Sequence, residues 1–137
     1  AAVEGMYDHD DRQPAVLYQI GLAPMYTACG NTFIDECIRL AGGRNVCGRM
    51  TDYPMLDWEE AVAFMPEVIL IPTMGQGEFE ATRAAWAPWT WVPAVRHGRI
   101  HLLDSDLFDR PGPRLVLGLE QMARLLHPEA FATAEGP

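Results

Sequence analysis

The sequence predicts a three-layer α/β domain in which a mostly parallel β-sheet is flanked by helices. Two continuous apolar runs, residues 15–20 and 68–71, are typical of strands that are buried on both faces of a parallel sheet. Segments with the helical spacing of apolar residues follow these runs, which is the alternation of an α/β fold. The length of 137 residues suffices for one compact domain.

The first strand and the first helix have clear signals in the sequence. Residues 15–20 form the strand, and residues 21–30 are predicted to be a loop because proline and glycine punctuate them. Asn31 or Thr32 can cap the helix that follows, in which apolar residues recur at helical spacing. Gly42 ends this helix, because glycine adopts the left-handed conformation that a helix C-terminus favours.

The second half of the chain continues the alternation. Asp57 and Glu60 have the spacing of a capping box and open a helix that Pro66 closes. The buried strand at residues 68–71 follows. The remaining predicted elements are a short helix over 79–86, a strand at 99–103 preceded by a strand at 91–92, and a last helix from about 113 to 126.

Charge and composition exclude several classes of function. Acidic residues outnumber basic residues 19 to 10, and this balance repels a phosphate backbone, so we expect no nucleic-acid partner. All basic residues are arginine, which excludes sites that need a P-loop lysine or a lysine Schiff base. No apolar run approaches the roughly 18 residues that a membrane helix requires. The chain is therefore not expected to span a membrane itself.

The three cysteines, Cys29, Cys37 and Cys47, form no CxxC motif. Their spacing allows one disulfide or none, and it does not indicate the redox compartment. Cys37 lies on the apolar face of the predicted first helix, so we interpret it as a small core residue.

Catalytic motifs are missing from the sequence. It contains no GxGxxG, no Walker A motif, no GxSxG elbow, no HExxH and no cluster of cysteine and histidine ligands. Asp104, Asp106 and Asp109 lie close together, but their spacing matches no EF-hand loop. We therefore expect no enzyme, no catalytic residue, no metal site and no cofactor, with a small α/β enzyme domain as a remote alternative.

Ligands of such sheets meet the loops at the carboxyl ends of the strands. Three segments here carry side chains suited to a ligand: residues 24–29, 52–54 and 104–110. Together they offer two tyrosines, several carboxylates, a phenylalanine and an arginine. A binding function is therefore favoured over catalysis.

A set of short segments resembles one known family over roughly residues 15–127. The combination of Ala-Gly-Gly-x-Asn with a carboxylate-helix-Pro-strand block is fairly specific. The chain resembles the C-terminal lobe of periplasmic binding proteins for cobalamin and iron chelates, which are class III substrate-binding proteins of ABC transporters. The segments that carry the resemblance are 17–21, 25–27, 33–34, 40–46, 53–54, 58–60, 66–71, 106–110 and 112–114.

The resemblance implies a receptor with two α/β lobes joined by a long helix, which holds its ligand between the lobes and delivers it to a membrane permease. Residues 14–128 would be the second lobe, residues 1–13 the end of the connecting helix or a leader, and residues 129–137 a tail. It also implies a periplasmic or lipid-anchored extracytoplasmic location, with the signal peptide and the N-terminal lobe absent from this chain.

The resemblance further implies roles for single residues. Tyr26 and Tyr53 match positions at which cobalamin receptors place aromatic rings against the corrin. Glu59 matches the carboxylate that docks onto arginines of the permease, and its place in the first turn of a helix suits an acidic side chain. The loop near the C-terminal end would supply the remaining ligand contacts: Asp106, Phe108, Asp109 and Arg110.

The identity of the ligand stays open at this stage. Cobalamin requires stacking and hydrogen bonds, which Tyr26 and Tyr53 can supply. A phenolate is also a hard oxygen donor suited to ferric iron, so the same tyrosines could bind haem or a ferric siderophore. The first expectation is cobalamin, and haem or a ferric siderophore is the alternative.

Overall fold

The computed structural model describes residues 13–72, 76–108 and 112–128. In this part of the chain six strands form one mixed sheet in the order β4-β2-β1-β5-β6, and β3 pairs with the start of β1. Pairing is parallel between β1 and β3, β1 and β5, and β5 and β6, whereas β2 is antiparallel to both β1 and β4. The strands are β1 (Ala15–Ile20), β2 (Met25–Thr27), β3 (Arg44–Asn45), β4 (Met55–Leu56), β5 (Val68–Pro72) and β6 (Ile100–Leu103).

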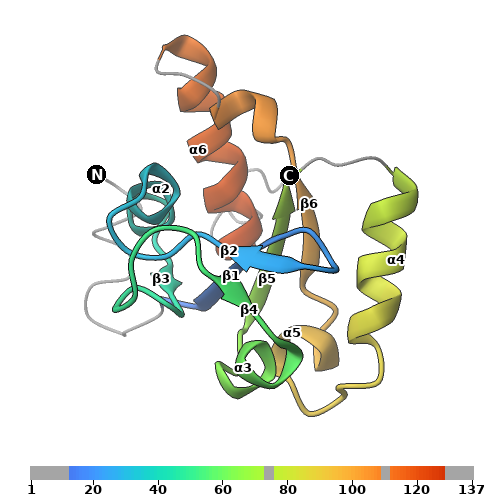
Figure 1. Cartoon of the computed structure of the whole chain (residues 1–137). Coiled ribbons are helices and arrows are strands. Elements are labelled where there is room, and N and C mark those ends of the chain that lie inside the picture. The colour runs from blue at the N-terminus through green and yellow to red at the C-terminus, as the bar shows by residue number, and fades with distance from the viewer. Residues whose placement is uncertain (1–12, 73–75, 109–111, 129–137) are drawn as a thin grey trace, which may run out of the picture.

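Helices cover both faces of the sheet, which confirms the predicted three layers. Figure 1 shows α2 and α6 on one side of the sheet and α4 on the other, with α3 and α5 near the lower end of the view. The helices are α2 (Phe33–Leu40), α3 (Trp58–Ala63), α4 (Gln76–Trp86), α5 (Pro93–Arg96), the short 3₁₀ helix η1 (Ser105–Phe108) and α6 (Pro113–Leu126).

The alternation of side chains along β1 divides the core into two clusters. Val16 and Tyr18 point into the first cluster, where residues of α2 and α6 pack against the sheet. Leu17 points into the second cluster, which includes residues of α3, α4 and α5. Because β1 is buried on both faces, its sequence is continuously apolar instead of alternating.

The predicted helix caps are present. The Thr32 hydroxyl accepts a hydrogen bond from the Asp35 backbone N–H at the start of α2. Asp57 and Glu60 form the expected capping box of α3, in which each side chain accepts from the other residue's backbone N–H. Gly42 follows α2 with φ of 91°, a left-handed conformation that glycine adopts without strain.

The structure corrects two predictions about secondary structure. Residues 25–27, which were predicted to be a loop, form β2. Like β3 and β4, this strand is too short to show a periodic pattern in the sequence. Residues 91–92, predicted as a strand, lie in a turn before α5. Val92 is the N-cap of α5 and Pro93 occupies its first turn, where the fixed φ of proline favours a helix.

Cys29 and Cys47 form a disulfide, which answers the question that their spacing left open, and Cys37 is a free, buried cysteine as expected. Among the helices that the structure describes, none combines the length and apolar character needed to cross a membrane.

Candidate ligand-binding face

The candidate site is built on the short antiparallel ladder of β2 and β4. Its hydrogen bonds continue beyond the assigned strands: the Thr27 N–H donates to the Pro54 carbonyl at 3.2 Å, and the Cys29 N–H donates to the Asp52 carbonyl at 2.9 Å. Asp52 has φ of 65°, a left-handed conformation that aspartate tolerates better than most residues. The segment that carries Tyr53 is thus held along the segment that carries Tyr26.

Four apolar side chains share one face of this ladder, because directly paired residues of neighbouring strands point to the same side. Tyr26 pairs with Ile20 of β1 and with Met55 of β4. Tyr53 precedes Met55 by two residues and therefore points to the same side. The exposed fractions are 38% for Tyr26, 50% for Tyr53 and 62% for Met55. We call Ile20, Tyr26, Tyr53 and Met55 the aromatic patch.

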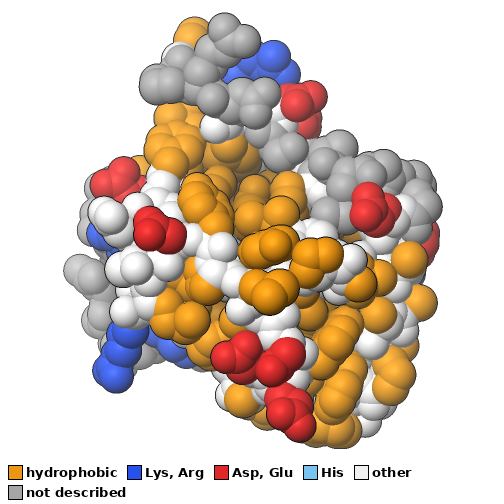
Figure 2. All heavy atoms as spheres, viewed as in Figure 1, with side chains coloured by type: hydrophobic (Ala, Val, Ile, Leu, Met, Phe, Trp, Pro, Cys, Tyr) orange, Lys and Arg blue, Asp and Glu red, His pale blue; other side chains and the backbone are white. Residues whose placement is uncertain are grey.

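The aromatic patch lies in an apolar area of the surface. Figure 2 shows hydrophobic side chains gathered in the middle of the view, where β2 and β4 lie. The structure thus brings together the two tyrosines that the sequence singled out. It adds Met55, which sequence reasoning missed. The available signal was its two-residue spacing from Tyr53, but β4 could not be recognised as a strand from two residues.

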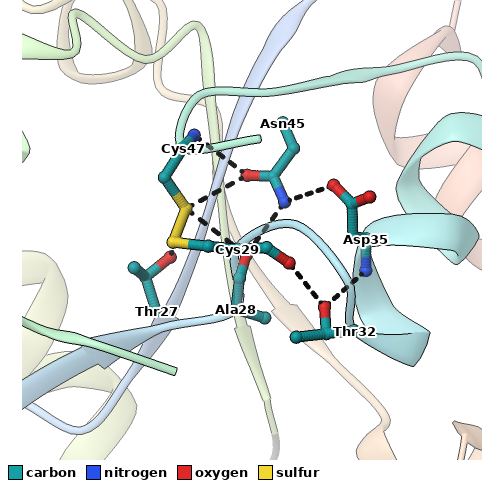
Figure 3. Close-up of a disulfide and its surroundings, with 7 residues drawn as sticks. All are labelled: Thr27, Ala28, Cys29, Thr32, Asp35, Asn45 and Cys47. Atoms are coloured by element: carbon teal, nitrogen blue, oxygen red, sulfur yellow. Dashed lines mark hydrogen bonds between the residues drawn. A yellow bond between two sulfur atoms is a disulfide. The ribbon is translucent and has the colours of Figure 1, made fainter. Parts of the chain in front are cut away.

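A buried network fixes the ladder from the side of α2 (Figure 3). The Cys29–Cys47 disulfide links the end of the β2 segment to the turn after β3, and both sulfur-bearing residues are buried. The Asn45 Nδ2 donates to the Ala28 carbonyl and to Asp35 Oδ1, both at 2.9 Å. The Thr32 hydroxyl donates to the Cys29 carbonyl at 2.7 Å. Loop residues beside the aromatic patch are therefore held by a cross-link and by satisfied polar groups.

Gly30 is required at the end of this ladder. A Cβ atom at Gly30 would collide with the Gly48 carbonyl oxygen and lie 2.8 Å from the Met50 carbonyl oxygen. The Gly30 N–H donates to that same Met50 carbonyl at 2.8 Å. Only glycine allows the two segments to approach this closely.

Tyr18 lies in the core next to the patch. Burial raises the pKa of its phenol far above the ordinary value, and the neighbouring Tyr53 and Cys37 raise this pKa further. The free thiol of Cys37 is affected in the same way, because burial, with Glu36 adding to it, raises its pKa to about 11. Both groups are therefore neutral at physiological pH.

The loop after β6 contributes less to the described face than the sequence suggested. Asp106 is exposed in η1, where its backbone N–H donates to Asp104 Oδ1 at 3.1 Å. Phe108 is buried in the core cluster of α2 and α6, where Gly118 of α6 leaves room for its ring. Because its ring is buried there, the structure does not offer Phe108 as the ligand contact that the sequence predicted. Asp109 and Arg110 lie outside the described residues.

The start of α3 presents acidic side chains below the patch in the view of Figure 2. The capping box engages the carboxylates of Asp57 and Glu60. Glu59 is exposed in the same turn and is left to point outward. Next to Glu59 in the sequence, the Trp58 ring meets the buried Trp86 ring edge-on, with 4.8 Å between the ring centroids, and stacks on the Trp89 ring, with 6.1 Å between the centroids. The core therefore fixes the position of this turn.

A polar groove of about 450 Å³ lies at the opposite, amino-terminal end of the strands, lined by Gln13, Asp35, Arg39, Gly43, Arg44, Asn45 and Gly48. None of the expected ligand contacts lines it. Within the described residues, no group of three or more histidine, cysteine, aspartate or glutamate side chains is placed to hold a metal ion.

Comparison with known proteins identifies the class. No protein-family model matches the chain. A vitamin B12-binding protein of Vibrio vulnificus is 31% identical over 121 residues, which are 86% of this chain and 41% of that protein. An uncharacterized ABC transporter substrate-binding lipoprotein of Bacillus subtilis, YvrC, is 27% identical over 122 residues, 88% of this chain and 38% of that protein. The chain thus spans about two fifths of the length of these relatives.

Solved structures agree with this result. A periplasmic heme-binding protein from Pseudomonas aeruginosa superposes with a TM-score of 0.77 at 28% identity, covering 93% of this chain and 47% of that one. The resemblance to class III substrate-binding proteins of ABC transporters is therefore confirmed over most of the chain. By their names, the B. subtilis relative is a lipoprotein that binds the substrate of an ABC transporter, and the P. aeruginosa protein is periplasmic.

Proposed function

We propose that this chain is the C-terminal ligand-binding lobe of an ABC-importer receptor and that the aromatic patch is its half of the ligand cleft. The observation that carries the proposal is the placement of Tyr26, Tyr53 and Met55 on one exposed face of a ladder that a disulfide and a buried network hold rigid. Large apolar side chains exposed together are characteristic of binding surfaces. The similarity to substrate-binding proteins over most of the chain supports this assignment.

The proposed ligand is cobalamin, a large ring system with a polar periphery. The tyrosine rings and the Met55 thioether offer flat and adaptable apolar contacts, and the phenol groups offer hydrogen bonds. The vitamin B12-binding protein of V. vulnificus supports this choice. Haem or a ferric siderophore is the second candidate. The similarity to the heme-binding protein of P. aeruginosa favours it, because a tyrosinate is a suitable ligand for ferric iron.

We further propose that Glu59 docks the receptor onto arginines of a permease. A carboxylate that takes no part in the capping box can accept two parallel hydrogen bonds from a guanidinium group. The Cys29–Cys47 disulfide supports a periplasmic or lipid-anchored location, since disulfides persist in oxidising compartments.

The ligand is tested with the natural full-length protein that carries this sequence. Cyanocobalamin, haemin and a ferric hydroxamate are titrated while tryptophan fluorescence is followed, because Trp58 lies three residues after Met55. We expect cyanocobalamin to quench with saturation, and Met55→Ala to weaken its binding at least about threefold. Met65→Ala is the matched control, because Met65 is also exposed but follows α3 and lies outside the patch. Quenching by an iron ligand alone would reject cobalamin.

Removal of a tyrosine hydroxyl distinguishes binding by ring stacking from binding by iron ligation. Tyr26→Phe keeps the ring and should keep the affinity for cyanocobalamin within about twofold, whereas loss of an iron–phenolate bond should abolish the charge-transfer band of bound haemin. The same pair of measurements applies to Tyr53→Phe.

Docking is tested by charge reversal at matched positions. Glu59 and Glu36 are both exposed acids in the first turn of a helix, α3 and α2 respectively. We expect Glu59→Arg to lower ligand uptake in cells at unchanged ligand affinity, and Glu36→Arg to leave uptake unchanged. Equal uptake by the two variants would remove Glu59 from the docking surface.

A further inference from the structure

Tyr18 is a buried tyrosine in the middle of β1, and its hydroxyl lacks a hydrogen-bond partner among the residues that the structure describes. Only 4% of its surface is exposed. Its neighbours in the same core cluster are apolar residues such as Val16, Leu70 and Ala28, together with the thiol of Cys37. A phenylalanine would fill such a site without desolvating a hydroxyl. A buried polar group without a partner lowers stability, so its presence calls for a physical explanation.

The register of the sheet places Tyr18 in the row of residues next to the aromatic patch. Gln19 of β1 pairs with Thr27 of β2, so the next position along β1, Tyr18, lies opposite Ala28. The hydrogen bonds from Thr27 to Pro54 and from Cys29 to Asp52 extend the ladder on the other side, which sets Tyr53 opposite Ala28 as well. Tyr18 and Tyr53 therefore flank Ala28 in one row across the sheet.

The side chains of Tyr18 and Tyr53 point to the same side of the sheet, and Ala28 between them is fully buried. The effect of Tyr53 on the pKa of Tyr18 agrees with phenol groups that lie near one another. Within the described residues, no hydrogen bond or ring contact holds the Tyr53 side chain, and half of its surface is exposed. A recognition role for Tyr18 requires that the Tyr53 ring turns aside and exposes the Tyr18 hydroxyl to a molecule on the patch.

We propose that Tyr18 is a ligand-recognition residue whose hydroxyl, together with that of Tyr53, donates a hydrogen bond to an oxygen acceptor at the edge of the bound ligand. The chemical class of the acceptor is a carboxylate or amide oxygen, both of which a phenol can serve. This inference rests on the proposed function of the aromatic patch and adds to it a residue from the core. It explains why a hydroxyl is kept at a position that packing alone would give to phenylalanine.

The test is Tyr18→Phe in the natural full-length protein. Two quantities are measured, the melting temperature of the ligand-free protein and the affinity for the ligand, because a structural role and a recognition role predict different changes in them. If the hydroxyl serves the ligand, its removal leaves the melting temperature of the ligand-free protein unchanged or raises it. The affinity for the ligand then falls about three- to tenfold, the effect of one hydrogen bond. Thr82→Val is the control for affinity, because it removes a buried hydroxyl of α4 that lies outside the aromatic patch.

Two ligands show which chemical group, an amide or a carboxylate, supplies the oxygen that accepts the hydrogen bond. Cyanocobalamin offers amide oxygens and haemin offers carboxylates, so the ligand whose affinity responds to Tyr18→Phe identifies the group. In a double-mutant cycle, Tyr18→Phe and Tyr53→Phe should be non-additive, since both hydroxyls serve one acceptor. A ligand that binds the unchanged protein and Tyr18→Phe equally well overturns this inference but leaves the proposed function standing. A lowered melting temperature of the ligand-free variant also overturns it. The absence of binding by any ligand overturns both.

Discussion

The parallel part of the sheet and its antiparallel edge are held together by different means. β1 and β5 lie between two helical layers, with side chains buried on both faces. The ladder of β2 and β4 has one buried face and one face on which the aromatic patch is half exposed. Its position is fixed by the Cys29–Cys47 disulfide and by the hydrogen bonds of Asn45. The comparison teaches that hydrophobic burial stabilises the fold, whereas cross-links position the candidate ligand face.

The largest effect is expected from a cavity in the parallel part. Leu70 of β5 is fully buried, so Leu70→Ala should lower the free energy of unfolding by about 3 kcal/mol, measured by urea denaturation. Leu40→Ala, at an exposed leucine of α2, is the control and should change it by less than about 0.5 kcal/mol. Similar losses in the two variants would contradict the assignment of stability to the parallel core.

Removal of the disulfide tests the edge. Cys29→Ala/Cys47→Ala should lower the free energy of unfolding by about 3 kcal/mol, the value for a closed loop of this size. Ligand affinity should fall as well, under conditions where circular dichroism shows the variant to be folded. Cys37→Ala keeps the disulfide and serves as the comparison for affinity. A folded double variant with full affinity would show that the cross-link does not position the patch.

The polar network is expected to give a smaller effect. Asn45→Ala leaves Asp35 Oδ1 and the Ala28 carbonyl without the amide donor, so the free energy of unfolding should fall by about 2 kcal/mol. Chemical denaturation measures this loss, and ligand titration shows whether the network also orders the patch. No loss of stability on the substitution would show that water replaces the amide at both acceptors.

The last effect is absent at neutral pH and concerns the free cysteine Cys37 of α2. Burial raises the pKa of Cys37 from 9.0 to about 11, so the folded protein holds a proton that the unfolded chain releases in this range. The free energy of unfolding should therefore fall as the pH rises from 9 to 11, whereas below pH 9 the thiol is protonated in both states and adds no pH dependence. Denaturation curves of Cys37→Ala should show a flatter dependence over this range. Slow alkylation of the native thiol at about pH 8 gives an independent check, and rapid alkylation would contradict its burial.

Elements with a strong local signal were predictable. The apolar runs of β1 and β5 indicated buried strands, and the caps Thr32 and Asp57 marked the starts of α2 and α3. The short strands β2 and β4 were not predictable, since two or three residues carry no periodicity and their pairing depends on partners distant in sequence. For the same reason Met55 was missed as a candidate, although Tyr26 and Tyr53 were singled out. Tyr18 lies in the predicted strand β1, but its place in the row with Tyr53 depends on the pairing of β1 with β2.

The sequence by itself determined the α/β class, the order of the main helices and strands, and the resemblance to substrate-binding proteins, because these depend on local periodicity and on residues close along the chain. The tertiary structure alone decided that Cys29 pairs with Cys47 and that Phe108 turns into the core. It also decided that Tyr18 and Tyr53 flank Ala28. These features depend on strand register and on packing between segments far apart in the chain, which local sequence patterns do not encode.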